Sequence, residues 1–302
     1  MSVALLAAFA AAPTRAASTQ DACSPNFSDY KVSIFGSTSP TSAAPDPSST
    51  VYPPNGYKVL SGGAIVQTLQ GSAFLTGSYP DFDSDAPDVP IGWYGDSKHQ
   101  GTGTRARLTT YVIAVYDPNN CWSVKAFQQS TVTPSAHPSV TVALGTGYVL
   151  TGGGARAIPA TPGGNGSFLY SSIPWVSAGS AYNGWSAQSK DQSINDPANI
   201  TAWAIGIKPA VAGVNMPTSN VNAGKPSASL NNPIALANGY NNVLPGVNCT
   251  LTGGGANDNW GAGWGNLLTA IYPLGTSGWE ALGQSSGPES ASVLTAYSVC
   301  LN

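Results

Sequence analysis

The sequence predicts an all-β protein built from three copies of one unit. A pattern of glycine, apolar, proline and tryptophan residues occurs three times along the 302-residue chain. No segment shows a sustained helical period of 3.6 residues. Glycine and proline are abundant, with 35 and 24 residues, whereas only 8% of the residues are charged, compared with about 25% in an average soluble domain. The repeat carries most weight, because internal repetition sets the architecture of a chain.

The repeated pattern combines a glycine block, an apolar pair, a proline, a Gly-Trp pair and a β-branched segment that contains an aromatic residue. The copies read Gly62-Gly63-Ala64, Phe74-Leu75, Pro80, Gly92-Trp93 and Leu108 to Tyr111; then Gly152 to Ala155, Phe168-Leu169, Pro174, Gly184-Trp185 and Ile200 to Trp203; then Gly253 to Ala256, Leu267-Leu268, Pro273, Gly278-Trp279 and Leu294 to Tyr297. The apolar pair and the proline are always six residues apart, and the tryptophan and the last aromatic residue are always eighteen apart. Fixed spacings indicate paired strands, because one inserted residue would turn every later side chain to the wrong face.

Other features of the repeat predict turns and loops. The eighteen-residue block has a middle rich in turn residues, at 101–103, 195–197 and 287–288, which predicts a hairpin. The interval between the proline and the tryptophan varies, at thirteen, eleven and six residues, as is typical of loops. The glycine block predicts a bulge or a close backbone approach. A phosphate-binding loop is excluded, because no helix pattern follows the block and no Lys-Ser/Thr closes it.

The chain divides into five parts. An apolar run, Val3–Ala12, is followed by Pro13 and small residues, which predicts a secretory signal peptide over residues 1–17; a buried N-terminal helix is the alternative. A lead-in (18–30) and three repeats (31–118, 119–209 and 210–302) follow. The later apolar segments are too short to span a bilayer, and the formal charge of −3 gives no basic footprint for nucleic acid.

Two architectures fit three such copies. One is a single β-prism-like body, with three sheets around a pseudo-threefold axis and one sheet per copy. The other is a tandem array of three small β-sandwich modules. The connections between copies contain strand-like segments such as Val140–Leu144, and a module of about 90 residues would have a small core. These observations favour the single body.

The repeat also predicts how the four cysteines pair. With the glycine blocks aligned, Cys249 falls where the other copies have Tyr57 and Tyr148. With the last aromatic residues aligned, Cys300 falls where they have Ala114 and Gly206. A large residue opposite a small one in two copies, and two cysteines in the third, indicates neighbours across strands. We therefore predict the disulfides Cys249–Cys300 and Cys23–Cys121, which suit an oxidising compartment. No Cys-x-x-Cys or nearby histidine suggests a metal site.

Candidate ligand-binding residues lie where the copies differ. Trp260 and Trp264 lie in a variable loop beside Asp258. Exposed indole rings can stack on the apolar face of a sugar while carboxylate and amide groups bind its hydroxyls. The alternative is that both tryptophans fold back over the end of a sheet, since large aromatic residues are usually buried.

A second candidate is the acidic insertion of copy one, which contains Asp81, Asp83 and Asp85. Alternating carboxylates can bind Ca²⁺ through oxygen ligands. The segment is not an EF-hand, because Ala86 and Gly92 stand where that motif requires glycine and glutamate. A solvated acidic turn is the simpler interpretation, so no metal or other cofactor is assigned.

No residue is assigned a catalytic role. The chain has only two histidines, His99 and His137, and no Gly-x-Ser-x-Gly elbow. A glycosidase would need two carboxyl groups about 5–10 Å apart, which only a three-dimensional structure can reveal.

The third copy resembles a repeat found in many secreted proteins of actinobacteria and in some phage and surface proteins. The resemblance rests on Cys249, Gly253–Gly255, Pro273, Gly278-Trp279 and Thr295 to Cys300, and copies one and two match without the cysteines. The threefold plan is similar to β-prism proteins such as the vitelline membrane outer layer family and jacalin-like lectins. The resemblance implies a secreted β-repeat protein and no catalytic residue. The sugar-binding motif of monocot lectins, Gln-x-Asp-x-Asn-x-Val-x-Tyr, is absent, so no sugar-binding residue is implied.

Together these features predict a secreted, non-catalytic protein that binds a polysaccharide or glycoconjugate through variable loops at one end. A structural matrix, coat or fibre subunit that self-associates through sheet edges is the first alternative. A glycan-active hydrolase is the second.

Overall fold

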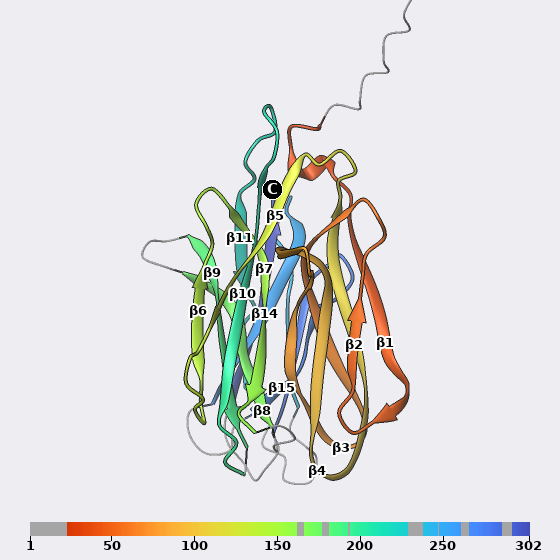
Figure 1. Cartoon of the computed structure of the whole chain (residues 1–302), viewed down its shortest axis with the longest axis vertical. Helices are drawn as coiled ribbons and strands as arrows, with labels where there is room; N and C mark the ends of the chain where they lie inside the picture. The colour runs from red at the N-terminus through yellow and green to blue at the C-terminus, as the bar shows by residue number, and fades with distance from the viewer. Residues whose placement is uncertain are drawn as a thin grey trace, which may run out of the picture.

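The computed structural model describes residues 23–161, 166–176, 181–192, 194–228, 238–246, 248–260, 266–285 and 292–302, with the backbone alone at 40–43, 68–72, 100–104, 227–228, 238–241, 260 and 285. Its elements are a short 3₁₀ helix and seventeen strands (Figure 1). They are η1 (Phe27–Asp29), β1 (Val32–Ala44), β2 (Ser48–Val51), β3 (Tyr57–Asp83), β4 (Ala86–Tyr116), β5 (Trp122–Ser130), β6 (Ser139–Ala143), β7 (Val149–Pro159), β8 (Ser167–Val176), β9 (Tyr182–Asp191), β10 (Ala198–Pro209), β11 (Ser219–Ala223), β12 (Ser227–Ala228), β13 (Asn238–Val243), β14 (Thr250–Trp260), β15 (Asn266–Pro273), β16 (Trp279–Ser285) and β17 (Ser292–Leu301). None of the described residues forms a helix long and apolar enough to cross a membrane.

Each copy contributes two groups of three antiparallel strands. In copy two, β10 lies between β7 and β5, and β9 lies between β8 and β6. In copy three, β17 lies between β14 and β11, and β16 lies between β15 and β13. In copy one, the long strands β3 and β4 supply both groups, with β1 and β2 at the edges.

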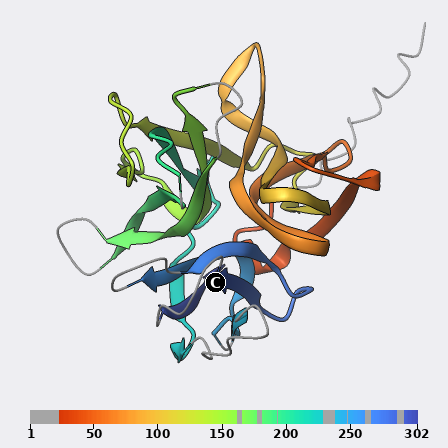
Figure 2. The same ribbon diagram turned by 90° about the horizontal axis from the view of Figure 1, so that it is seen from below.

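The groups of neighbouring copies are joined by short strand pairings. The alanine that ends each glycine block pairs with a residue two positions before the proline of another copy; the pairs are Ser78 with Ala155, Ser172 with Ala256 and Ile271 with Ala64. The result is three six-stranded sheets in one body, arranged around a central axis (Figure 2). Copy three pairs back to copy one, which confirms the single body over the tandem array. The expectation of one sheet per copy is wrong, because each sheet takes half its strands from each of two copies.

The predicted hairpin within the eighteen-residue block is also wrong. In copy two, the block runs along β9 and β10, and these strands lie in different sheets with different partners. The residue alternation of a strand is the same whether its partner follows directly or lies elsewhere in the chain. Turn residues between two strands therefore indicate a change of direction without identifying the partner.

The glycine block allows two close approaches, as predicted. A Cβ on the middle glycine, for example Gly254, would lie closer than 3.0 Å to the ring of Trp279 in the same copy. A Cβ on the following glycine, Gly255, would lie closer than 3.0 Å to the carbonyl oxygen of Ser172 in copy two. The equivalent contacts occur in the other copies, at Gly62, Gly63, Gly153 and Gly154. The block therefore admits the tryptophan of its own copy and the backbone of its neighbour.

The three tryptophans of the Gly-Trp pairs are fully buried, as expected. The indole nitrogens of Trp93 and Trp185 each donate a hydrogen bond of 2.9 Å to a serine Oγ, at Ser78 and Ser172 respectively. Copy three has Ile271 at the position of these serines, and the Trp279 indole nitrogen has no hydrogen-bond partner. The repeat thus keeps the ring in all three copies and its polar contact in two.

Both predicted disulfides are present, Cys249–Cys300 and Cys23–Cys121, with Cα–Cα distances of 5.6 and 5.7 Å. The equivalent positions are also neighbours in copy two, where a Cβ on Gly206 would lie 2.8 Å from the Cβ of Tyr148. Two disulfides are typical of extracellular proteins.

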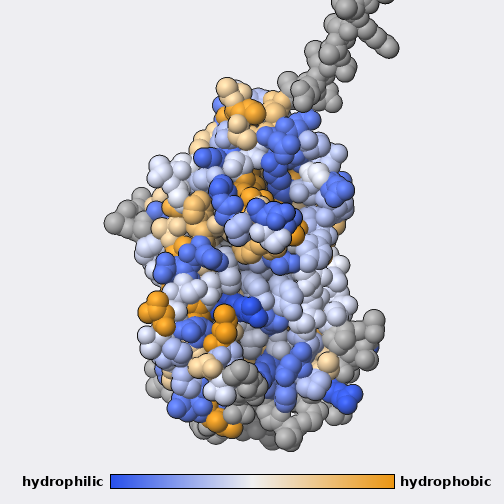
Figure 3. Space-filling model, in the orientation of Figure 1, coloured by the Kyte–Doolittle hydropathy of each residue, from blue (hydrophilic) through white to orange (hydrophobic). Residues whose placement is uncertain are grey.

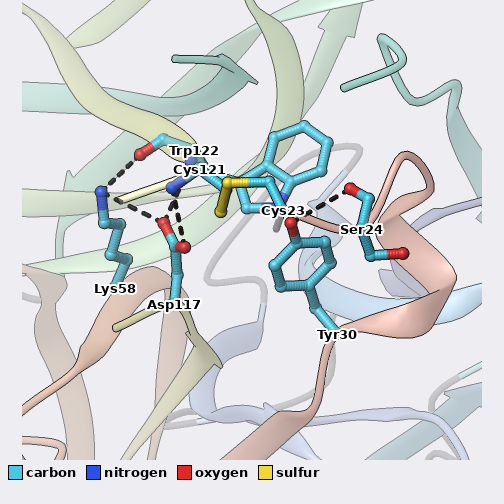
Figure 4. Close-up of a disulfide and its surroundings, with 7 residues drawn as sticks. All are labelled: Cys23, Ser24, Tyr30, Lys58, Asp117, Cys121 and Trp122. Carbon is cyan, nitrogen blue, oxygen red and sulfur yellow. Dashed lines mark hydrogen bonds and ion pairs between the residues drawn. A yellow bond between two sulfur atoms is a disulfide. The ribbon is translucent and has the colours of Figure 1, made fainter. Parts of the chain in front are cut away.

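The Cys23–Cys121 disulfide fastens the lead-in to one end of the molecule, which we call the cap end (Figure 4). Phe27 is buried there against Trp122, with ring centroids 5.4 Å apart. The carboxylate of Asp117 accepts hydrogen bonds from the backbone nitrogens of Cys121 and Trp122. The opposite end, where β3 and β4 bend at 68–72 and 100–104, is the loop end.

Candidate functional site

The first predicted site is only partly described, and its carboxylate is not at the surface. Trp264 and the side chain of Trp260 lie outside the described residues. Asp258 is 0% exposed. The expectation that its carboxylate binds a sugar at the surface is therefore wrong. It stands two residues after Ala256, and the equivalent residues of the other copies, Val66 and Ala157, also belong to the core. Burial raises the pKa of Asp258 to about 6, and burial also lowers the pKa of nearby Lys190 to about 8.

The two predicted sites lie at opposite ends of the molecule. Ser78 pairs with Ala155 and Gly77 pairs with Arg156, so the chain from Ser78 to Asp81 runs against the direction of β7. Ala155 holds the same position in copy two as Ala256 holds in copy three, and from Ala256 the chain continues to Asp258 in the direction that β7 takes. Asp81 is therefore displaced toward the cap end and Asp258 toward the loop end. The expectation of variable loops gathered at one end is wrong.

The acidic insertion forms a turn whose carboxylates do not converge. Asp81 accepts a hydrogen bond of 2.6 Å from the Tyr52 hydroxyl and one of 3.0 Å from the backbone nitrogen of Phe82. Asp83 accepts a hydrogen bond of 3.1 Å from the backbone nitrogen of Asp85. Within the part of the chain that the structure describes, no three His, Cys, Asp or Glu side chains gather where they could hold a metal ion. The geometry matches the solvated acidic turn.

A groove of about 460 Å³ lies beside this turn, where copy one meets copy two. Three segments line it: the connection from β2 into β3, the start of β4, and the turn into β5. Its residues are Pro53, Pro54, Asn55, Gly56, Tyr57, Lys58, Val89, Pro90, Ile91, Asn120, Ser123, Val124 and Lys125. Gly56 and Asn120 have φ angles of +85° and +56°, so left-handed turns shape two of the three segments.

The groove combines apolar walls with neutralised cations. Val89 and Ile91 are 37% and 39% exposed. The ammonium of Lys125 pairs with Asp88, and that of Lys58 lies 3.3 Å from Asp117 and donates to the Trp122 carbonyl (Figure 4). Each lysine thus has its own carboxylate, and neither carries an uncompensated charge that would select an anion.

Tyr52 connects the groove to the acidic turn. Its ring is 55% exposed and lies against Gly92, where a Cβ would come within 2.5 Å of the ring. Gly92 follows the groove residue Ile91, and Tyr52 precedes Pro53. The hydrogen bond to Asp81 fixes the ring and raises the pKa of its hydroxyl to about 12. An aromatic face, a carboxylate and a groove with apolar and amide groups are therefore continuous.

A smaller groove of about 200 Å³ occupies the equivalent place between copies three and one. It is lined by Val32, Ile34, Cys249, Thr250, Leu251 and Thr276. Val32 and Val124 hold equivalent edge-strand positions, opposite Val115 and Ile207, and Cys249 stands at the position of Tyr57. The architecture thus leaves a groove at more than one junction, and copy one enlarges its own with the longer insertion.

Sequence reasoning missed the groove residues but had a signal that points to them. The interval between the repeat proline and tryptophan is longest in copy one, at thirteen residues, and it contains Val89, Pro90 and Ile91.

Hydrophobic residues on the face shown in Figure 3 are scattered among hydrophilic ones.

Comparisons of the chain with protein-family models and with curated proteins found no match.

Proposed function

We propose that the protein is a secreted, non-catalytic binding protein for a neutral, hydroxyl-rich polymer, a polysaccharide or the glycan of a glycoconjugate. The observation that carries the proposal is the exposed Tyr52 ring, held by Asp81 beside the groove. An aromatic face suits the apolar side of a sugar ring, and carboxylate and amide groups suit its hydroxyls. Secretion is proposed because the two disulfides are typical of extracellular proteins.

The pairing of the lysines argues for a neutral polymer over an anionic one. Lys58 and Lys125 each pair with an aspartate, and the neighbouring turn carries Asp81, Asp83 and Asp85. A sulfated or uronic acid polymer would meet excess negative charge at this site.

The experiment is a pull-down of the full mature chain with the neutral insoluble polymers cellulose, chitin and curdlan. Wild type should bind at least one of them, and Tyr52→Ala should bind the same polymer about tenfold more weakly, a loss of about 1.4 kcal/mol. Leu244→Ala is the matched control. Leu244 holds the position of Tyr52 in copy three and is 65% exposed, so its removal should leave binding unchanged.

Two results would refute parts of the proposal. Wild type that binds none of the polymers would refute glycan binding. Equal binding by wild type, Tyr52→Ala and Leu244→Ala would keep glycan binding and refute the groove as its site.

A further inference from the structure

The interior of copy three is polar near the loop end, where the other copies are apolar or nearly so. Two core positions there carry Asp258 and Asn266, both 0% exposed. The equivalent residues in copies one and two are Val66 and Ala157 for Asp258, and Ala73 and Ser167 for Asn266. The repeat therefore provides two internal references for what the fold itself requires at these positions, and neither requires a charge.

Both side chains adjoin the same position on a facing strand. In copy two, Ser167 Oγ donates a hydrogen bond of 2.9 Å to Ser189 Oγ. The equivalents of these residues in copy three are Asn266 and Gly283. A Cβ on Gly283 would lie closer than 3.0 Å to Oδ2 of Asp258, so the carboxylate occupies the space of the missing side chain. Asn266 and Asp258 therefore point into one small region of the core.

These buried polar atoms are poorly satisfied. The side-chain polar atoms of Asn266 have no hydrogen-bond partner, and the oxygens of Asp258 make no well-aligned hydrogen bond. The Ser292 hydroxyl and the charge of Lys190 both act on the Asp258 carboxylate and lower its pKa, but the effect of burial is larger. A buried polar group without a partner is costly, and such groups in native proteins call for a water or an ion. Ser292, 2% exposed and paired opposite Trp260, faces the same side of its strand as Leu294, the partner of Asp258. It adds a hydroxyl oxygen beside the carboxylate.

We propose that Asp258, Asn266 and Ser292 form a binding site for a metal cation that prefers oxygen ligands. Carboxylate, amide and hydroxyl oxygens are the ligands that Na⁺ and Ca²⁺ take in proteins. A single carboxylate supplies little charge, and Lys190 of copy two acts electrostatically on Asp258. The affinity should therefore be modest, with a dissociation constant of about 1 mM for Ca²⁺, as in extracellular modules. This inference is independent of the groove and of its proposed ligand.

The test is thermal unfolding of the full chain at pH 7.5 and constant ionic strength. Chloride salts of Na⁺ and Ca²⁺ are compared with N-methylglucamine chloride, in which no small metal cation is present. At 10 mM Ca²⁺, or at 150 mM Na⁺ if the site prefers the monovalent ion, the wild-type Tm should rise by about 3 °C. Equilibrium dialysis against the same ion should give one bound ion per chain.

Two substitutions restore the residues of the other copies and should abolish the rise: Asp258→Val, the residue of copy one, and Asn266→Ser, the residue of copy two. Both residues are already accommodated by this fold. The matched control is Asp46→Asn, which removes a half-exposed carboxylate paired with His99 and should keep the full rise. A rise of equal size in all four proteins would be a general salt effect and would overturn the proposal, as would no rise in wild type.

Discussion

Gly255 in copy three lies against the carbonyl oxygen of Ser172 in copy two, so close that a Cβ on Gly255 would clash with this oxygen. The contact sits on the pairing that joins the two copies. Gly255→Ala should therefore force the strands apart and lower the free energy of unfolding by about 3 kcal/mol. Chemical denaturation measures this change. Gly246→Ala is the control, because its nearest neighbour would be 3.7 Å from the new Cβ; its effect should stay within about 0.5 kcal/mol. Equal effects would contradict the close-approach explanation.

The hydrogen bond from Trp185 to Ser172 predicts a different response in copies two and three. Ser172→Ala leaves the indole nitrogen buried without an acceptor and should cost about 1–3 kcal/mol. In copy three, Ile271→Ser and Ile271→Ala both lose the burial of the isoleucine, but the serine gives Trp279 an acceptor. Ile271→Ser should therefore be more stable than Ile271→Ala by about 1 kcal/mol. The reverse order in urea denaturation would show that the Trp279 nitrogen needs no partner.

Asp258 predicts a pH dependence of stability. Its folded-state pKa of about 6 exceeds the usual value near 3.8, so between pH 4 and pH 6 the folded state holds a proton that the unfolded state has lost. The free energy of unfolding in metal-free buffer should fall as the pH rises through this window, by about 3 kcal/mol, and then level off. Asp258→Val should remove this fall and be the more stable protein at pH 7.5. Parallel pH profiles for the two proteins would contradict the burial of an ionisable carboxylate.

The repeat also predicts how to replace a disulfide. Copy two has Tyr148 and Gly206 at the positions of Cys249 and Cys300, with the tyrosine packed over the glycine. Loss of a native disulfide typically costs about 2–5 kcal/mol. The double substitution Cys249→Tyr with Cys300→Gly should recover part of this loss through burial of the ring, compared with Cys249→Ala and Cys300→Ala. Thermal unfolding that ranks the two double variants equally would show that the positions are not interchangeable.

The sequence predicted most where the three copies can be compared position by position, because a residue type that is ambiguous in one copy is clear in another. The all-β class, the three copies and both disulfides follow from the repeat, because equivalent positions such as Tyr148 and Cys249 experience the same surroundings. The sharing of sheets was not predictable, since a two-residue pairing such as Ser172 with Ala256 leaves no mark in the alternation of residues. The burial of Asp258 was readable from its equivalents Val66 and Ala157. The groove was readable only in part: the long interval of copy one marks Val89, Pro90 and Ile91, but only the folded chain brings them together with the lining residues of copy two.

Each sheet is shared by two copies, and this sharing has a consequence for how such a molecule could arise and be rebuilt. A single copy expressed alone would expose two inner strand edges, those of the β7 and β8 type, and could not satisfy them within itself. In this chain three copies close every inner edge as a ring, so an isolated copy should form a homotrimer through the same edge pairings. In the present chain Pro25, near the start of the described residues, and Asn302 lie near one another, since they bond to Asn215 and Thr218 respectively. A circular permutant opened between copies one and two should therefore fold to the same ring.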